Sequence, residues 1–218
     1  MYVNKVIKVL ITSDFFMLSA AGIVSPIFAI FITENVQGGN IALVGYVSTV
    51  YLLVKAFFQL IFGRWIDKKE SEKYDFALLI VGSIITSLVP LGYIFSKLPW
   101  HIYFIEALNG LGFAMTLPSW YAIFTRHIDR GQEGFQWSLE TMLVALGGAI
   151  AASAGGYLAE HYGFKLIFIL MSVLSMIGSL FLILIYNELK THKFVVTPRT
   201  TDEYIRPLKK RLIHKRYF

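Results

Sequence analysis

Cysteine is absent from the 218-residue sequence, and charged side chains are scarce. Without cysteine the chain can form no disulfide framework, and nothing follows about the redox state of its compartment. Charged residues make up 16% of the chain, whereas a typical soluble domain contains about 25%. The composition therefore argues against an ordinary water-soluble domain.

Recognisable catalytic and cofactor-binding patterns are also missing. His101 has no second histidine or acid at a metal-ligand spacing, and no glycine-rich phosphate loop occurs. An intramembrane serine protease would need a reactive serine with a partner histidine, and no Gly-x-Ser-x-Gly motif is present. We therefore expect no enzyme activity, no metal and no cofactor.

Long apolar runs are abundant, because 56% of the residues are hydrophobic. A bilayer-spanning helix needs about 20 apolar residues, and six runs reach that length. They lie near residues 10–31, 41–62, 76–96, 101–123, 137–158 and 165–186. The first run is too long for a signal peptide and lacks a cleavage pattern, so we expect it to be retained. The pattern predicts an all-α, polytopic protein with a six-helix transmembrane domain over 1–186 and a basic tail over 187–218.

The basic residues are distributed unevenly between the two predicted sides. Of the 20 Lys and Arg residues, 17 fall in the N-terminus, two connections and the tail on one side. Only Lys97 and Lys165 fall on the other side, and Lys55 lies inside a span. By the positive-inside rule, the basic side faces the cytoplasm. We therefore predict a multi-pass protein of the plasma or inner membrane with both termini cytoplasmic.

Two predicted cytoplasmic connections carry candidate functional residues. In the first, Gly63 is expected to end the preceding helix, and Asp67 and Lys68 follow within one short charged stretch. In the second, Arg126 and Arg130 lie four residues apart. These five residues are candidates for gating loops because of the family resemblance that the first connection carries.

The first connection resembles the signature loop of the major facilitator superfamily. That loop reads Gly, any, Leu, small, Asp, Arg, any, Gly, Arg, Lys or Arg, and Gly63, Asp67 and Lys68 match its type and spacing. The positions that depart from the pattern are Trp65, Ile66, Glu70, Ser71 and Glu72. The resemblance extends over about residues 10–186, which corresponds to one half of a twelve-helix transporter of that superfamily.

The fifth span resembles the glycine motif of the corresponding helix in the same superfamily. Gly147, Gly155 and Gly156 match, whereas Ala151 and Ala152 replace a Gly-Pro pair that is associated with antiporters. Small residues let helix backbones approach closely in lipid. We therefore expect these glycines to pack against another helix, and the sequence does not support antiport.

Polar residues inside the spans are candidates for a solute or ion cavity, because such residues are costly in lipid. Asp14 and Ser25 share one face of the first span, and Lys55 and Gln59 share one face of the second. The fourth span adds Glu106, Asn109 and Trp120. Each ionisable group has an alternative: Asp14 and Glu106 as interfacial acids, and Lys55 as a lysine that snorkels to the membrane surface.

The resemblance implies a transporter half built from two three-helix repeats around a midplane site. It implies movement of a small solute by alternating access, with proton coupling through Asp14 or Glu106. A second copy in parallel orientation, or another six-helix half, would complete the transporter. Asp67 would then contact the start of the fifth span in the other half. The alternative is a non-transporting six-helix protein, a degenerate transporter half that acts as a scaffold or regulator.

The tail differs in composition from the spans, with nine basic and three acidic residues over 187–218. Residues 208–216 form a basic amphipathic end, which favours contact with anionic lipid. A solvated, unstructured tail is the alternative. We expect the lipid bilayer as a partner and no nucleic acid, because no folded nucleic-acid motif accompanies the charge.

Overall fold

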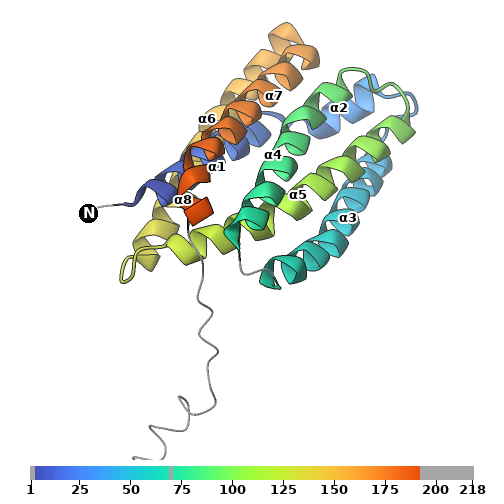
Figure 1. Ribbon diagram of the computed structural model, residues 1–218. Helices are drawn as coiled ribbons and strands as arrows, with labels where there is room; N and C mark the ends of the chain where they lie inside the picture. Colours follow the sequence, from blue (N-terminus) through green and yellow to red (C-terminus); the bar gives the residue numbers. More distant parts are fainter. Residues whose placement is uncertain (1–2, 69–70, 192–218) are drawn as a thin grey trace, which may run out of the picture.

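The computed structural model describes residues 3–68 and 71–191, and the chain over these ranges is built from helices (Figure 1). The all-α class predicted from the sequence is confirmed. Residues 192–218, which include most of the predicted basic tail, lie outside the described residues. The elements are α1 (Lys5–Val24), α2 (Phe28–Asn35), α3 (Ile41–Asp67), α4 (Glu72–Tyr93), α5 (Pro99–His127), α6 (Glu133–Tyr162), α7 (Phe164–Phe181), the 3-10 turn η1 (Leu182–Ile185) and α8 (Tyr186–Thr191).

Helix boundaries follow the local sequence. Asn4 caps α1, because its side-chain oxygen accepts a hydrogen bond from the Ile7 N–H at 3.0 Å, and Asn40 caps α3 in the same way. Pro26 lies between α1 and α2, where it interrupts the first predicted span. Gly163 separates α6 from α7 with a φ of 75°, a conformation that favours glycine.

The predicted end of the second span is wrong. Helix α3 continues through Gly63 to Asp67, and Lys68 is its C-cap. Gly63 is not among the described glycines with positive φ, so it continues the helix instead of ending it. At 27 residues α3 is about 40 Å long, which exceeds the roughly 30 Å hydrocarbon core. Residues 63–67 therefore form the end of a helix that extends beyond the apolar layer, and the connection is shorter than expected.

The helices form two groups that meet along α4 and α7 (Figure 1). In one group α5 packs against both α3 and α4, and in the other α1 packs against both α6 and α7. Helices α3 and α6 occupy the outer edges. In the most apolar 18-residue stretch of each helix, only 11% of the residues are buried. The corresponding share of α4 is 56%, so α4 belongs to the interior of the bundle.

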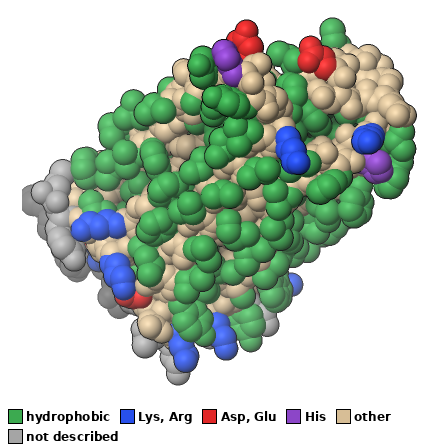
Figure 2. All heavy atoms as spheres, turned by 90° about the horizontal axis from the view of Figure 1, so that it is seen from above, with side chains coloured by type: hydrophobic (Ala, Val, Ile, Leu, Met, Phe, Trp, Pro, Cys, Tyr) green, Lys and Arg blue, Asp and Glu red, His purple; other side chains and the backbone are tan. Residues whose placement is uncertain are grey.

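Five of the described helical segments are long and apolar enough to cross a membrane: Lys5–Val24, Ile41–Asp67, Glu72–Tyr93, Glu133–Tyr162 and Phe164–Lys190. Helix α5, at 29 residues, is also long enough to cross a membrane, but it is not among these five segments. It carries polar side chains that include Glu106 and Asn109. It lies between α3 and α4 within the bundle. Figure 2 shows a face covered largely by hydrophobic side chains, with most charged side chains near its rims.

Two clusters of buried apolar side chains fill the bundle, one at each end. The cluster at the end that holds the N-terminus contains Leu10, Leu79 and Phe124 from three different helices. The cluster at the opposite end contains Phe31, Tyr93 and Phe168. The candidate functional groups lie between and beside these clusters.

Candidate functional site

A cavity of about 240 Å³ lies among α1, α5 and α6. Two of the predicted site residues, Asp14 and Trp120, line it. The remaining lining residues are Met17, Leu18, Phe113, Thr116, Leu117, Tyr121, Trp137, Glu140 and Thr141. The structure thus brings together acidic and aromatic groups from helices that are far apart in the sequence.

Two carboxyl groups share this cavity. Asp14 of α1 is half-buried, and within the described part of the chain it has no hydrogen-bond or ion-pair partner. Glu140 of α6 accepts a hydrogen bond from the Thr141 hydroxyl at 3.1 Å. The sequence reasoning missed Glu140, although an acid inside the predicted 137–158 span was a signal for it. Among the residues that the structure describes, no lysine or arginine lines the cavity, so its described ionisable groups are acidic.

Aromatic rings form much of the cavity wall. Trp120 stacks on Phe124 with ring centroids 4.6 Å apart, and the Trp137 ring lies 6.0 Å from that of Trp120. The indole Nε1 of Trp120 is buried, and among the described residues it has no hydrogen-bond acceptor. Trp137 was not among the predicted site residues, because a tryptophan near the start of a span is also typical of an anchor at the membrane interface.

Lys55 lies beside the cavity without lining it. Its ammonium nitrogen is 5.6 Å from the centroid of the Tyr51 ring and 5.7 Å from that of Phe113, both suitable for cation–π attraction. Phe113 also lines the cavity, so Lys55 lies within cation–π distance of one of the lining rings. Gln59, one turn further along α3, is half-buried and lies outside the cavity lining.

Glu106 belongs to a separate polar group near the other end of the bundle. The Tyr93 hydroxyl donates to one carboxyl oxygen, and the Asn109 amide donates to the other at 3.4 Å. Only 6% of Glu106 is exposed, so these partners compensate for its burial. Ser25 is exposed at the break after α1 and does not join Asp14, although both had been assigned to one helix face.

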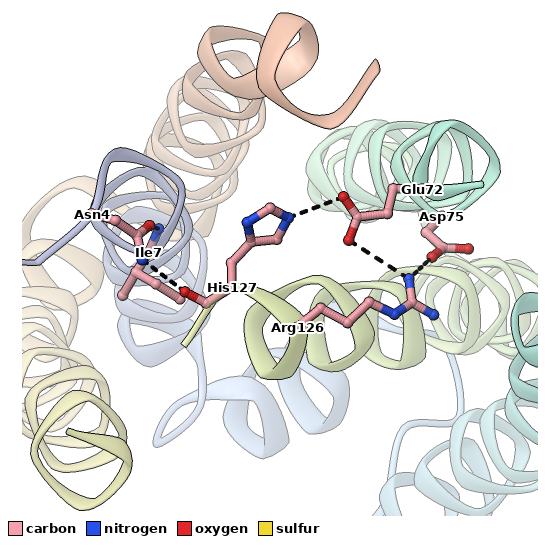
Figure 3. Close-up of polar contacts among 6 residues, drawn as sticks. All are labelled: Asn4, Ile7, Glu72, Asp75, Arg126 and His127. Atoms are coloured by element: carbon pink, nitrogen blue, oxygen red, sulfur yellow. Dashed lines mark hydrogen bonds and ion pairs between the residues drawn. The ribbon is translucent and has the colours of Figure 1, made fainter. Parts of the chain in front are cut away.

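An ion network links α4 to α5 at the end that holds the N-terminus (Figure 3). Glu72 and Asp75, in the first turn of α4, are buried. Arg126 pairs with Asp75 and approaches Glu72 at 3.9 Å, and the His127 ring lies 3.0 Å from the other Glu72 oxygen. Acids at a helix N-terminus and bases at a helix C-terminus also suit the two helix dipoles.

Hydrogen bonds extend this network to α1 and α6. The Asn4 side chain donates to the His127 carbonyl at 2.7 Å, as Figure 3 shows. Asp129, in the loop that follows, accepts a hydrogen bond from the Gln136 amide at 2.5 Å. Hydrogen bonds from Gln136 and then Asn4 stabilise the charged form of Asp129 and hold its pKa below the usual value. Four helices thus meet around one polar cluster.

Of the five predicted gating residues, Arg126 alone takes part in this ion network as the structure describes it. Asp67, Lys68 and Arg130 are exposed, and a Cβ added at Gly63 would meet nothing within 4 Å. The sequence reasoning missed Glu72 and Asp75. Both precede the predicted third span, and acids at a helix start are ordinarily exposed dipole partners.

The predicted packing glycines differ in their surroundings. A Cβ at Gly155 would lie 2.9 Å from the carbonyl carbon of Ile23, and one at Gly147 would lie 2.7 Å from the Phe15 ring. Both therefore mark close contacts between α6 and α1. A Cβ at Gly156 would meet nothing within 4 Å, so this glycine is not required by packing within the described bundle.

A sequence model described as Major Facilitator Superfamily matches residues 10–218. The chain belongs to this superfamily. It is 24% identical over 176 residues to a "Multi-drug resistance efflux pump PmrA homolog" from Lactococcus lactis subsp. lactis (strain IL1403). That alignment covers 80% of this chain and 42% of the relative, so the chain spans less than half the length of the relative.

Membership in the superfamily has two direct consequences. The chain is a multi-pass integral membrane protein of a transporter family, in agreement with its helices of membrane-spanning length. The superfamily comprises transporters and not enzymes, in agreement with the missing catalytic motifs. The cavity and the ion network are therefore interpreted in terms of transport.

Proposed function

We propose that this chain forms a six-helix half of a transporter that moves a small solute by alternating access, together with a second six-helix bundle. The observation that carries the proposal is the acidic cavity among α1, α5 and α6 in a chain of this superfamily. The efflux-pump name of the Lactococcus lactis relative supports solute movement. In such transporters the solute site lies between two bundles near the bilayer midplane.

The internal spacing of the helices supports two three-helix repeats. Helix α6 begins 92 positions after α3 (133 − 41), and α7 begins 92 positions after α4 (164 − 72). Packing follows the same relation, because α3 packs on α5 as α6 packs on α1. The acids Asp14 and Glu106 are also 92 positions apart (106 − 14), so they occupy equivalent sites in the two repeats. With α1 and α2 together as the first span, the chain has six membrane spans, α5 included.

The second bundle is a second copy of this chain in parallel orientation. Helices α3 and α6 support this assignment, because both lie at outer edges of the bundle and expose large apolar side chains such as Leu53 and Ile150. Two copies related by an axis along the membrane normal would imitate the two halves of larger members of the superfamily. The residues Asp14, Gln59 and Lys55 on α1 and α3 would then approach the shared face.

Both termini face the cytoplasm in this proposal. Lys5, Arg64 and Arg126 lie on helix ends at the side of the bundle that holds the N-terminus, whereas Lys97 and Lys165 lie beside the opposite ends. This asymmetry follows the positive-inside rule. A reporter enzyme fused after Phe218 should be active only in the cytoplasm. Activity on the outer side would contradict the orientation.

Asp67 acts as a latch between the two copies. It is exposed at the end of α3, and Phe135 lies in the first turn of α6. The unpaired N–H groups at a helix N-terminus attract a carboxylate by about 0.3–1 kcal/mol at a surface. In this cysteine-free chain, Asp67→Cys with Phe135→Cys should crosslink two copies when the cytoplasmic side is closed. The absence of crosslinks between copies in every state would remove the latch and the dimer geometry.

Transport itself is tested with purified full chain reconstituted into vesicles. Lys55→Leu should abolish solute movement without loss of membrane insertion if Lys55 acts at the shared face. Insertion is measured by the yield of folded protein in detergent. Normal solute flux in the Lys55→Leu variant would show that Lys55 is not part of the site. A chain that is strictly monomeric and supports no flux would favour the alternative function, a non-transporting scaffold or regulator.

A further inference from the structure

We infer that the cavity among α1, α5 and α6 binds a small organic cation, an inference that rests on the proposed function and names its substrate class. Three independent features carry it: the two carboxyl groups, the aromatic wall and the size of the space. The sequence alone does not show that these residues are neighbours, because Glu140 and Trp137 join Asp14 only in the folded bundle.

The charge of the cavity selects a cation. Asp14 and Glu140 both line it, and no basic residue of the described ranges does. Two carboxylates in an apolar span are costly unless a positive charge or a proton compensates them. Asp14 has no such partner among the residues that the structure describes, whereas Glu140 receives only the Thr141 hydroxyl. Lys55 is not among the described residues that line the cavity, and in the described part of the chain no ion pair joins it to Asp14 or Glu140.

The wall of the cavity selects an organic cation over a metal ion. Phe113, Trp120, Tyr121 and Trp137 all line it, and aromatic faces attract organic ammonium groups. Calcium and magnesium prefer shells of six or more oxygen ligands, which this wall does not offer. Within residues 3–68 and 71–191, no group of three or more His, Asp or Glu side chains has the arrangement of a metal site.

The volume limits the size of the ligand. At about 240 Å³ the cavity is smaller than the roughly 300–1,000 Å³ typical of small-molecule sites. A cation with one aromatic ring fits such a space, whereas a large multi-ring molecule does not. The buried Nε1 donor of Trp120 adds a polar contact for a hydroxyl or ether oxygen on the same ligand.

The test uses two small probes that share a benzyl group and differ in the sign of their charge. Benzyltrimethylammonium is the cation, and phenylmethanesulfonate is the matched anion. Binding of each to the full chain in detergent is measured by isothermal titration calorimetry. We expect the cation to bind at least tenfold more tightly than the anion, a difference of about 1.4 kcal/mol. Equal affinity for the two probes would overturn the inference.

Variants locate the binding to the cavity. Asp14→Asn and Glu140→Gln should each weaken cation binding about tenfold, whereas Glu140→Asp, which retains the charge, should bind better than Glu140→Gln. Glu160→Gln is the matched control, because Glu160 is exposed near the opposite end of the same helix. Cation binding that is unchanged in both cavity variants would overturn the inference, as would an equal loss in the control.

These measurements distinguish a failure of the proposed cation site from a failure of the proposed transport function. Cation binding at the cavity without solute flux in vesicles would overturn the proposed transport and retain the cation site. Flux of another solute without any cation binding would retain transport and overturn the substrate class. In that case Asp14 and Glu140 would serve as proton carriers only.

Discussion

The hydroxyl oxygens of Ser87 and Ser179 lie 3.0 Å apart in the interior of the bundle, where α4 meets α7. The two serines are 92 positions apart (179 − 87), the same interval that separates the starts of α3 and α6. Both are buried, and the hydroxyl of Ser172 adds a further contact to the Ser87 carbonyl at 2.6 Å. A pair of equivalent residues therefore joins the two proposed repeats.

The first prediction concerns this contact. Ser87→Cys with Ser179→Cys should form a disulfide within one chain on mild oxidation, because oxygens 3.0 Å apart imply neighbouring Cβ atoms. The product is measured as the loss of thiol groups available to an alkylating reagent in denaturant. The chain's lack of other cysteines removes any background.

The control for that pair uses serines on the same two helices. Ser83→Cys with Ser172→Cys moves the thiols by four and seven residues in opposite directions along α4 and α7. At about 1.5 Å per residue, this shift places them about 16 Å apart along the helix axes. The control should stay reduced. A disulfide in the control and none in the Ser87–Ser179 pair would contradict the register of α4 and α7.

The second prediction concerns the ion network at the end of the bundle that holds the N-terminus. Arg126→Gln should lower the free energy of unfolding, because it leaves the buried Asp75 carboxylate without its cation. Breaking a fully buried pair costs about 3–5 kcal/mol, and we expect about 2–3 kcal/mol here because the Arg126 side chain is 24% exposed. The measurement is thermal unfolding in detergent.

A double variant separates charge from packing in the same network. Arg126→Gln combined with Asp75→Asn should recover much of the lost stability, because no unpaired charge remains. Arg130→Gln is the matched control and should change stability by less than about 0.5 kcal/mol, since Arg130 is exposed. Additive losses in the double variant would show that the two side chains do not interact.

The third prediction compares adjacent glycines of α6. Gly155→Ala should destabilise the fold by about 1–3 kcal/mol, because its Cβ would lie 2.9 Å from the Ile23 carbonyl carbon. Gly156→Ala should be neutral or stabilising by up to about 1 kcal/mol, because the space is open and alanine favours the helix. Both are measured as shifts in unfolding temperature. Equal losses at the two positions would indicate that a partner bundle covers Gly156.

The fourth prediction concerns acid stability. The pKa of Asp129 is lowered in the fold by the hydrogen bonds from Gln136 and Asn4. A lowered pKa contributes stability above the unfolded value of about 3.9, and that contribution is lost as the pH falls through the lower folded value. Asp129→Asn should therefore reduce stability at neutral pH and flatten its decline below about pH 4. A steeper decline in the variant would contradict the assigned direction.

Several parts of the fold follow from local sequence alone. Apolar runs predict helices of membrane-spanning length, since one span of lipid requires about 20 apolar residues. Pro26 lies at the interruption between α1 and α2, because a proline in a helix interior removes a backbone hydrogen bond. The end of α3 was predicted wrongly, because Gly63 is compatible with both a helix end and a helix interior, and the choice depends on its neighbours.

The candidate site was predicted only in part. Asp14 and Trp120 stand out because polar and amphipathic side chains are unusual within a span. Glu140 and Trp137 complete the same cavity from α6, a helix that lies more than a hundred residues after Asp14. Glu72 and Asp75 resemble ordinary acids at a helix start, and their burial depends on the approach of Arg126 from α5.

The sequence by itself determined the class of this protein: a multi-pass helical membrane protein, with the superfamily indicated by the motif residues Gly63, Asp67 and Lys68. These properties depend on composition and on spacing along the chain, both of which can be determined from the sequence without a tertiary structure. The tertiary structure alone decided which acids meet, which face of each helix is buried and which glycines touch a neighbour. Those outcomes depend on distances between helices, and no local pattern within one helix encodes the position of another.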